Sequence, residues 1–248
     1  MLHARQFAIM RKFSLLSIKG VPRAIVRAVT IPFLKKYLGK LPVDFLERYL
    51  SHAIQQQRFS ALFLSRHIAK REDVWDYVVD TIGASRRVLF LEFGVWEGYS
   101  ISYFAKKLQN PGGKFYGFDS FEGLPEDWGN RSVGTFSTRG APPIINDSRV
   151  SFVKGWFHRT VPSFEMDVSS FDVVLVHLGA DLYSSTVFVL SQLWLKVNAC
   201  YVVFDEFNGH EARALYSFSQ SFPCRIEFLA YDARPFPRRV FCKITRQA

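Results

Sequence analysis

From Arg87 onward, runs of apolar residues alternate with segments whose apolar positions recur at helical spacing. Continuous apolar runs are typical of buried parallel strands, and the intervening segments are typical of the helices that connect them. This alternation predicts an α/β fold with a doubly wound, mostly parallel sheet, which binds ligands at the carboxyl ends of its strands. The predicted strands are 88–93, 114–119, 150–155, 171–178, 200–207, 225–233 and 238–245.

The segments before and at the end of this alternating region have other patterns. Apolar residues recur at helical spacing through 43–83, where a second helix is predicted over about 71–83 and ends at Gly83. The last two predicted strands flank a Pro-Phe-Pro turn, which predicts an antiparallel closing hairpin. The expected fold therefore has a helical N-terminal extension and an antiparallel hairpin at the end of the sheet.

Composition narrows the class of protein. Hydrophobic residues make up 48% of the 248 residues and charged residues 22%, which excludes a disordered or collagen-like chain. The three cysteines are odd in number and lie in strand-like runs, so a reducing, cytoplasmic location is expected. The N-terminus shows no apolar segment followed by a small-residue cleavage site, so secretion is not expected.

The net charge of +10 is concentrated at the N-terminus. Residues 1–40 carry nine Lys or Arg and no Asp or Glu, which leaves 23 basic and 22 acidic residues in 41–248. The near-neutral body indicates no nucleic-acid partner. We therefore divide the chain into a basic N-terminal arm, 1–42, and a domain, 43–248.

Three interpretations of the arm stay open. It is an amphipathic basic helix on an anionic membrane surface or acidic partner, an organelle transit peptide, or an extension packed on the domain or on a second subunit of a homo-oligomer. No stretch of the arm reaches the roughly 18 uncharged apolar residues that a membrane-spanning helix needs.

The ends of the first two strands carry candidate ligand-binding residues. The first strand runs into E-x-G-x-x-x-G-x-S, formed by Glu92, Gly94, Gly98 and Ser100. The glycines allow a tight turn and a close approach of a ligand to the backbone, although such turns occur in many folds. Asp119 ends the second strand, where an acid accepts hydrogen bonds from ribose hydroxyls or, alternatively, caps a loop. The pair indicates a nucleoside-type ligand.

Four further motifs follow in order: FYGFDSFEGLPEDW, F-x-K-G-W-F-x-x-T-V-P, H-L-x-A-D-L-Y-S-S-T and FDEF. Together with the strand ends they resemble class I S-adenosylmethionine-dependent methyltransferases with a Rossmann-like fold, and more specifically the macrocin O-methyltransferase family. The resemblance covers roughly residues 70–245. It implies that the turn from Gly94 to Gly98 surrounds the methionine part of the cofactor, that Glu92 orients it and that Asp119 holds the ribose. It also implies cofactor contacts for Ser100 in the turn and for Phe121, Gly155, Trp156 and Phe157 around the adenine.

Simple core packing is the alternative role for Trp156 and Phe157. The loop 120–149 is long enough to be functional, and we expect it to form a lid or part of an acceptor pocket.

Carboxylates follow the fourth and fifth predicted strands. Asp181, Asp205 and Glu206 are oxygen ligands of the kind that Mg²⁺ prefers, and the resemblance implies a divalent metal that holds the acceptor hydroxyl. The alternative is that Asp181 caps the next helix. We predict Asp181 and His210 as catalytic residues, and a structural role for His177.

One position departs from the family pattern. The family reads H-L-D-A-D or H-I-D-x-D where this chain has Gly179 in place of the first acid. The expected function is transfer of a methyl group to a hydroxyl of a small molecule, such as a glycosylated metabolite. Because of Gly179, the alternative is a catalytically silent protein that binds the cofactor or docks on a membrane. A third reading is an enzyme on a lipid-linked or surface glycan, held at the membrane periphery by the arm.

Overall fold

The computed structural model describes residues 43–247 apart from 208, 234 and 235. The predictions for the arm, including membrane contact and oligomer formation, lie outside the described residues. No helix in the described part of the chain is both long and apolar enough to cross a membrane.

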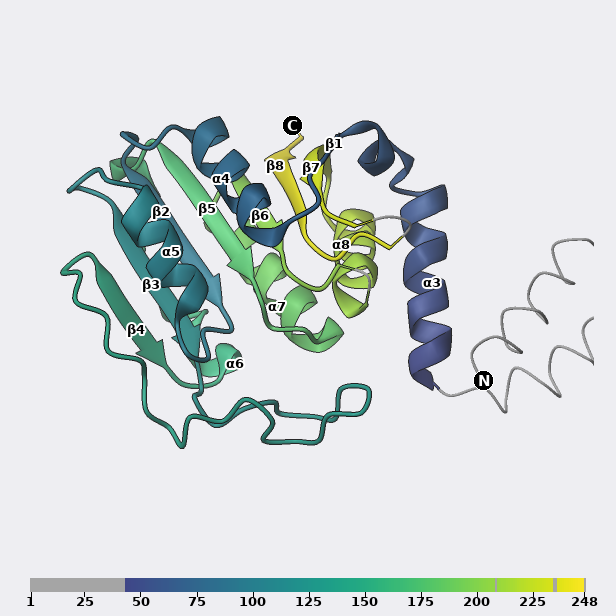
Figure 1. Ribbon diagram of the computed structural model, residues 1–248, viewed down its shortest axis with the longest axis horizontal. Coiled ribbons are helices and arrows are strands. Elements are labelled where there is room, and N and C mark those ends of the chain that lie inside the picture. The colour runs from purple at the N-terminus through teal and green to yellow at the C-terminus, as the bar shows by residue number, and fades with distance from the viewer. Residues whose placement is uncertain (1–42, 208, 234–235, 248) are drawn as a thin grey trace, which may run out of the picture. The chain divides into compact units, whose positions relative to one another are not determined.

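An eight-stranded sheet forms the centre of the fold (Figure 1). The strand order is β1-β7-β8-β6-β5-β2-β3-β4, and all neighbours are parallel except β6–β8 and β7–β8. The predicted mostly parallel sheet and its antiparallel closing hairpin are thus confirmed. The strands are β1 Arg66–His67, β2 Val88–Phe93, β3 Lys114–Asp119, β4 Val150–Lys154, β5 Val173–Leu178, β6 Ala199–Phe204, β7 Cys224–Tyr231 and β8 Val240–Arg246.

Helices cover both faces of the sheet (Figure 1). One apolar cluster joins α4 and α5 to the sheet, and the other joins α7 and α8 to it. All six residues of β2 are buried, as expected of a central strand covered on both sides. The helical segments are α3 Val43–Gln57, α4 Arg71–Ile82, α5 Tyr99–Lys107, α6 Phe157–Thr160, α7 Tyr183–Trp194 and α8 His210–Ser221, with short 3₁₀ turns at Ser60–Leu64 and Val168–Ser170.

The end of α4 follows from its sequence. Val74, Trp75, Val78 and Val79 form its buried stripe. Gly83 then adopts a φ of 93°, which a residue with a side chain rarely takes, and its N–H still donates to the Val79 carbonyl. The predicted stop at Gly83 is therefore confirmed.

Two features of the sheet differ from the prediction. The two-residue strand β1 was not predicted, because its exposed residues, Arg66 and His67, carry no apolar signal. The strand predicted over 200–207 ends at Phe204, because the chain turns there and the Glu206 N–H donates to the Glu211 carboxylate instead of to a neighbouring strand. This turn places Asp205 and Glu206 at the carboxyl edge of the sheet.

Candidate active site

The turn after β2 has a backbone that requires glycine. Gly94 and Gly98 adopt φ values of 88° and 77°. Trp96, which lies between them, has a φ of 50° and is one of the few described residues other than glycine with a positive φ. Gly98 is the N-cap of α5, and Tyr99 and Ser100, the first two residues of that helix, line the pocket. Gly94 lines the pocket, whereas Gly98 does not, because a Cβ atom on Gly98 would lie 2.8 Å from the Pro143 side chain.

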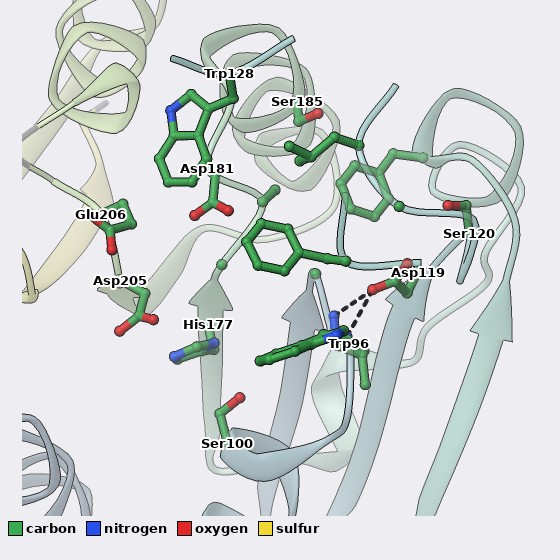
Figure 2. Close-up of a pocket in the computed structure, with 18 of the residues that line it drawn as sticks. Trp96, Ser100, Asp119, Ser120, Trp128, His177, Asp181, Ser185, Asp205 and Glu206 are labelled. Atoms are coloured by element: carbon green, nitrogen blue, oxygen red, sulfur yellow. Dashed lines mark hydrogen bonds between the residues drawn. The ribbon is translucent and has the colours of Figure 1, made fainter. Parts of the chain in front are cut away.

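Asp119 fixes the shape of that turn. Its Oδ2 accepts hydrogen bonds from the backbone N–H groups of Val95 and Trp96 at 2.8 and 3.0 Å (Figure 2). Its Oδ1 accepts from the N–H of Phe121 at 2.7 Å. Each carboxylate oxygen can accept more than one hydrogen bond, so these contacts are compatible with the predicted ribose contact. The structure adds a second role, which is to hold the loops after β2 and β3 together.

A buried polar cluster lies beneath the turn. The Ser100 hydroxyl donates to Oε1 of Glu92, and Nδ1 of His177 lies 3.1 Å from the same oxygen. Glu92 is completely buried, and its Oε2 has no hydrogen-bond partner in the described part of the chain. His177 lines the pocket, with the Trp75 ring edge-on at 5.7 Å. His177 therefore joins the first and fourth strand-end motifs, and its predicted structural role stays a prediction.

The predicted adenine-contacting residues divide into two groups. Gly155, Trp156 and Phe157 line the pocket, and the Phe157 ring packs edge-on against Phe93 at 5.6 Å. Phe121 does not line it, because its side chain is buried and packs edge-on against Phe152 at 6.0 Å. Its φ of 61° turns the chain toward Gly123 and Leu124, which do line the pocket.

Asp181 lies on the opposite side of the pocket, after β5 (Figure 2). It has a φ of 62° and makes no hydrogen bond or ion pair within the described residues. Leu182 is the N-cap of α7 and has no side-chain capping bond, so the alternative role of Asp181 as a helix cap finds no support. Burial raises the pKa of Asp181 to about 8, and the negative charges of Glu206 and Asp205 act in the same direction.

The other two predicted metal ligands are paired with arginines. Nε of Arg239 lies 3.1 Å from Oδ1 of Asp205, and Arg238 forms an ion pair with Glu206. His210 begins α8 next to this region but does not line the pocket. Its predicted catalytic role therefore stays a prediction, without a position in the pocket to support it.

The loop 120–149 forms one wall of the pocket. Backbone hydrogen bonds between Leu124 and residues 134 and 135 fold it into a narrow hairpin. At the tip of this hairpin, the Arg131 guanidinium lies over the Trp128 ring at 4.5 Å, and Trp128 faces Asp181 in Figure 2. Phe136 packs edge-on against Trp96 at 5.4 Å. The loop thus contributes to the pocket, and its predicted role as a lid or part of an acceptor pocket stays a prediction.

The pocket-lining residues named above surround one cavity of about 1000 Å³. Typical small-molecule pockets measure roughly 300–1,000 Å³, so this one has room for a nucleoside cofactor and a second molecule. The turn after β2, Asp119 and Trp156 line one side, which we call the cofactor side. Asp181, Asp205 and the tip of the loop line the other, which we call the acceptor side.

Residues 91–207 match the protein family described as a methyltransferase domain. This segment is therefore similar to a methyltransferase domain. The match begins in β2 and ends just after β6, so it includes every strand end that lines the pocket. No curated protein matches the chain.

Solved structures of two methyltransferases share the fold of this chain. The O-methyltransferase NovP is 21% identical, with a TM-score of 0.52, over 71% of this chain and 79% of NovP. CalS11, a calicheamicin methyltransferase, is 20% identical, with a TM-score of 0.50, over 81% of this chain and 93% of CalS11. The Rossmann-like methyltransferase fold is therefore confirmed.

The pocket fits a nucleoside ligand better than it fits a metal ion. The glycine turn, Asp119 and the buried polar cluster suit a nucleoside with a charged amino-acid group. By contrast, no group of three or more His, Cys, Asp or Glu side chains in the described ranges is arranged to hold a metal ion. Gly179 removes one acid, and Arg238 and Arg239 occupy two others. The residues present therefore do not fit the predicted magnesium site.

Sequence reasoning missed several residues that line the pocket. Trp96, Trp128 and Arg131 lie in loops, where no periodicity marks a functional side chain. Their signal was the concentration of aromatic and basic residues in otherwise polar loops. Arg239 also lines the pocket. Its signal was the Arg-Arg pair just before the last strand, which the prediction counted as part of that strand.

Proposed function

We propose that the methyltransferase domain transfers a methyl group from S-adenosylmethionine to a hydroxyl group of a small molecule. The observation that carries this proposal is Asp181, a carboxylate in the pocket with no hydrogen-bond partner in the described residues, opposite the cofactor side. The names of NovP, an O-methyltransferase, and CalS11, a calicheamicin methyltransferase, support the same reaction class.

The cofactor side would hold S-adenosylmethionine through named groups. Asp119 would accept bonds from the ribose hydroxyls, and Trp156 would pack against the adenine. The backbone at Gly94 to Gly98 would surround the methionine part, with Glu92 and His177 below it. When bound, the cofactor supplies an electrophilic methyl group, and the protein supplies position and electrostatics.

Asp181 would act as the proton acceptor. An acceptor hydroxyl beside it would lose its proton to the carboxylate as its oxygen forms a bond to the methyl carbon, while the bond between that carbon and the cofactor sulfur breaks and S-adenosylhomocysteine leaves. A general base works best when its pKa lies near the working pH, and burial gives Asp181 a pKa of about 8. Holding the oxygen in line with the methyl group would supply much of the remaining acceleration.

The walls of the acceptor side indicate a molecule with an apolar face. Leu124 and Phe188 line the pocket, and the Trp128 ring, with the Arg131 guanidinium over it, lies near Asp181 (Figure 2). Flat aromatic surfaces suit the apolar faces of sugars and aromatic rings. We therefore favour a glycosylated or aromatic metabolite as the acceptor.

Gly179 supports a second candidate function, a protein that binds the cofactor without catalysing transfer. The acid that the family has at this position is missing. Calorimetry with S-adenosylmethionine, followed by a methyl-transfer assay on a panel of hydroxylated metabolites, separates the two functions. Binding together with transfer supports the enzyme, and binding without transfer to any acceptor supports the silent protein.

The decisive variant is Asp181→Asn, compared with Asp80→Asn on the exposed surface of α4. If Asp181 is the base, its variant keeps cofactor affinity and loses transfer by about 10²–10⁴-fold, the usual contribution of general-base catalysis. The Asp80 variant should keep both properties. Full transfer by Asp181→Asn would contradict the proposed mechanism.

A further inference from the structure

Two consecutive arginines, Arg238 and Arg239, lie just before β8, and Arg239 lines the pocket. The buried side chain of Asp232 fixes their backbone, because its Oδ1 accepts hydrogen bonds from the N–H groups of Arg238 and Arg239, each at 2.8 Å. The Asp232 N–H donates in return to the Arg239 carbonyl at 3.0 Å. The Phe207 N–H donates to the Arg238 carbonyl at 2.6 Å, which ties the same segment to the end of β6.

The two side chains pair one to one with the two acids after β6. Arg239 bridges Oδ1 of Asp205, at 3.1 Å from Nε, and Oδ2 of Asp232, at 3.4 Å from Nη1. Arg238 contacts both carboxylate oxygens of Glu206, with Nε 3.3 Å from Oε2 and Nη2 bonded to Oε1. A guanidinium group that binds a carboxylate through two N–H donors, in a bidentate arrangement, forms one of the stronger hydrogen-bonded pairs in proteins.

We propose that Arg238 and Arg239 take the place of a divalent cation at this site, so that the methyltransferase domain works without a metal. Two guanidinium groups carry the same two positive charges as Mg²⁺, and they contact two of the three acids predicted to bind it, Asp205 and Glu206. This inference rests on the proposed function only in naming Asp205 and Glu206 as part of the acceptor side.

Competition explains why a metal is excluded. Mg²⁺ needs several oxygen ligands in nearly octahedral geometry and gives up its water reluctantly. To bind here, it would have to displace both arginines and leave their charges unpaired in a partly buried region, which is costly. Gly179 removes the carboxylate that would help to offset this cost. The missing acid at Gly179 and the two arginines therefore both act against metal binding at this site.

Arg239 is then a positioning residue. Its side chain is only 16% exposed, it lines the pocket, and it is fixed at both ends by Asp205 and Asp232. It places a permanent positive charge beside the acceptor side. Unlike a metal ion, this charge cannot be removed by a chelator.

The test measures metal binding directly, without cofactor or acceptor. We expect calorimetric titration of the full chain with MgCl₂ or MnCl₂ to show no binding for the wild type. The double variant Arg238→Met/Arg239→Met, which exposes both acids, should gain measurable binding, at least tenfold tighter when Gly179→Asp is added. Arg225→Met, at an exposed position of β7 in the same hairpin, is the control and should gain none.

A second variant covers failure of the double variant to fold. Arg239→Gln keeps hydrogen-bonding capacity but removes the charge, and it should also gain Mn²⁺ affinity. Binding of Mg²⁺ by the wild type would overturn the proposal, and so would folded variants that gain no affinity for either ion. These results do not depend on methyl transfer, so failure of the proposed function would be recognised separately by the assay on acceptors.

Discussion

The backbone of Gly94 lies directly against the backbone of Gly179. A Cβ atom built on Gly94 would lie 2.3 Å from the Gly179 carbonyl oxygen, closer than real Cβ contacts come. This contact joins the ends of β2 and β5, the two central strands whose loops carry the cofactor side and Asp181. The geometry of the two halves of the pocket thus depends on the absence of a side chain at Gly94.

We therefore expect Gly94→Ala to damage both stability and cofactor binding. The matched control is Gly134→Ala, because Gly134 has a similar φ of 81° but nothing within 4 Å of its Cβ position. Both variants lose stability because alanine disfavours the left-handed backbone. Gly94→Ala alone should lose a further ~1–3 kcal/mol of unfolding free energy because of the clash with Gly179. Urea unfolding and calorimetry with S-adenosylmethionine measure the two effects. Equal losses in the two variants would show that the backbone contact is unimportant.

Asp119 should contribute to the stability of the fold as well as to cofactor binding. Replacing it with alanine removes the acceptor of three backbone N–H groups, and each hydrogen bond to a charged group is worth about 1.5–3 kcal/mol. We expect Asp119→Ala to weaken cofactor binding at least tenfold and to lower the free energy of unfolding. Asp119→Asn, which keeps one carbonyl acceptor, should lose less stability. Unchanged cofactor affinity in a folded Asp119→Ala protein would defeat the ribose assignment.

The sequence predicted the parts of this molecule that depend on local pattern. Buried strands such as β2 and the glycines at 83, 94 and 98 carry signals within a few residues, because periodicity and positive φ are local properties. The pairing of Asp205 and Glu206 with Arg239 and Arg238 joins residues more than thirty positions apart. Such contacts are set by sheet order, which no local pattern reveals, and this is why the sequence indicated a metal where the structure places arginines.

Trp128 should affect the acceptor and not the cofactor. It lies at the tip of the loop 120–149, opposite Asp181, and its ring is held by Arg131. We expect Trp128→Ala to raise the KM for the acceptor about tenfold or more, since stacking on an aromatic ring is worth about 0.5–1.5 kcal/mol beyond the apolar area that it buries. The affinity for S-adenosylmethionine should stay within twofold. A change confined to cofactor affinity would move Trp128 to the other side of the pocket.

The basic arm gives a prediction that is separate from the pocket. If residues 1–40 bind anionic membranes, their nine positive charges should give salt-sensitive co-sedimentation with phosphatidylserine vesicles, at about 1 kcal/mol per residue near the surface. Deleting 1–40 should abolish this binding and leave cofactor affinity unchanged. Equal sedimentation of the full-length and shortened chains would favour packing of the arm on the domain or on a second subunit.

The ionisation of Asp181 should appear in both activity and stability. Its pKa is raised from 3.8 to about 8, chiefly by burial and then by Glu206 and Asp205. The carboxylate form, which accepts the proton, becomes populated as the pH rises, so methyl transfer should increase up to about pH 8 and then level off. In Asp181→Asn, the small residual transfer should lack this dependence.

The sign is opposite for stability. A carboxyl group whose pKa is raised in the folded state contributes to the free energy of unfolding when it is protonated. This contribution is complete below pH 3.8 and is lost as the pH rises through about 8. Wild type should therefore lose stability relative to Asp181→Asn between these limits, and the difference should stop growing above about pH 8. Urea unfolding of both proteins from pH 5 to 9 measures it, with Asp80→Asn as the control. A constant difference across this range would mean that Asp181 is ionised throughout, and the raised pKa would then be wrong.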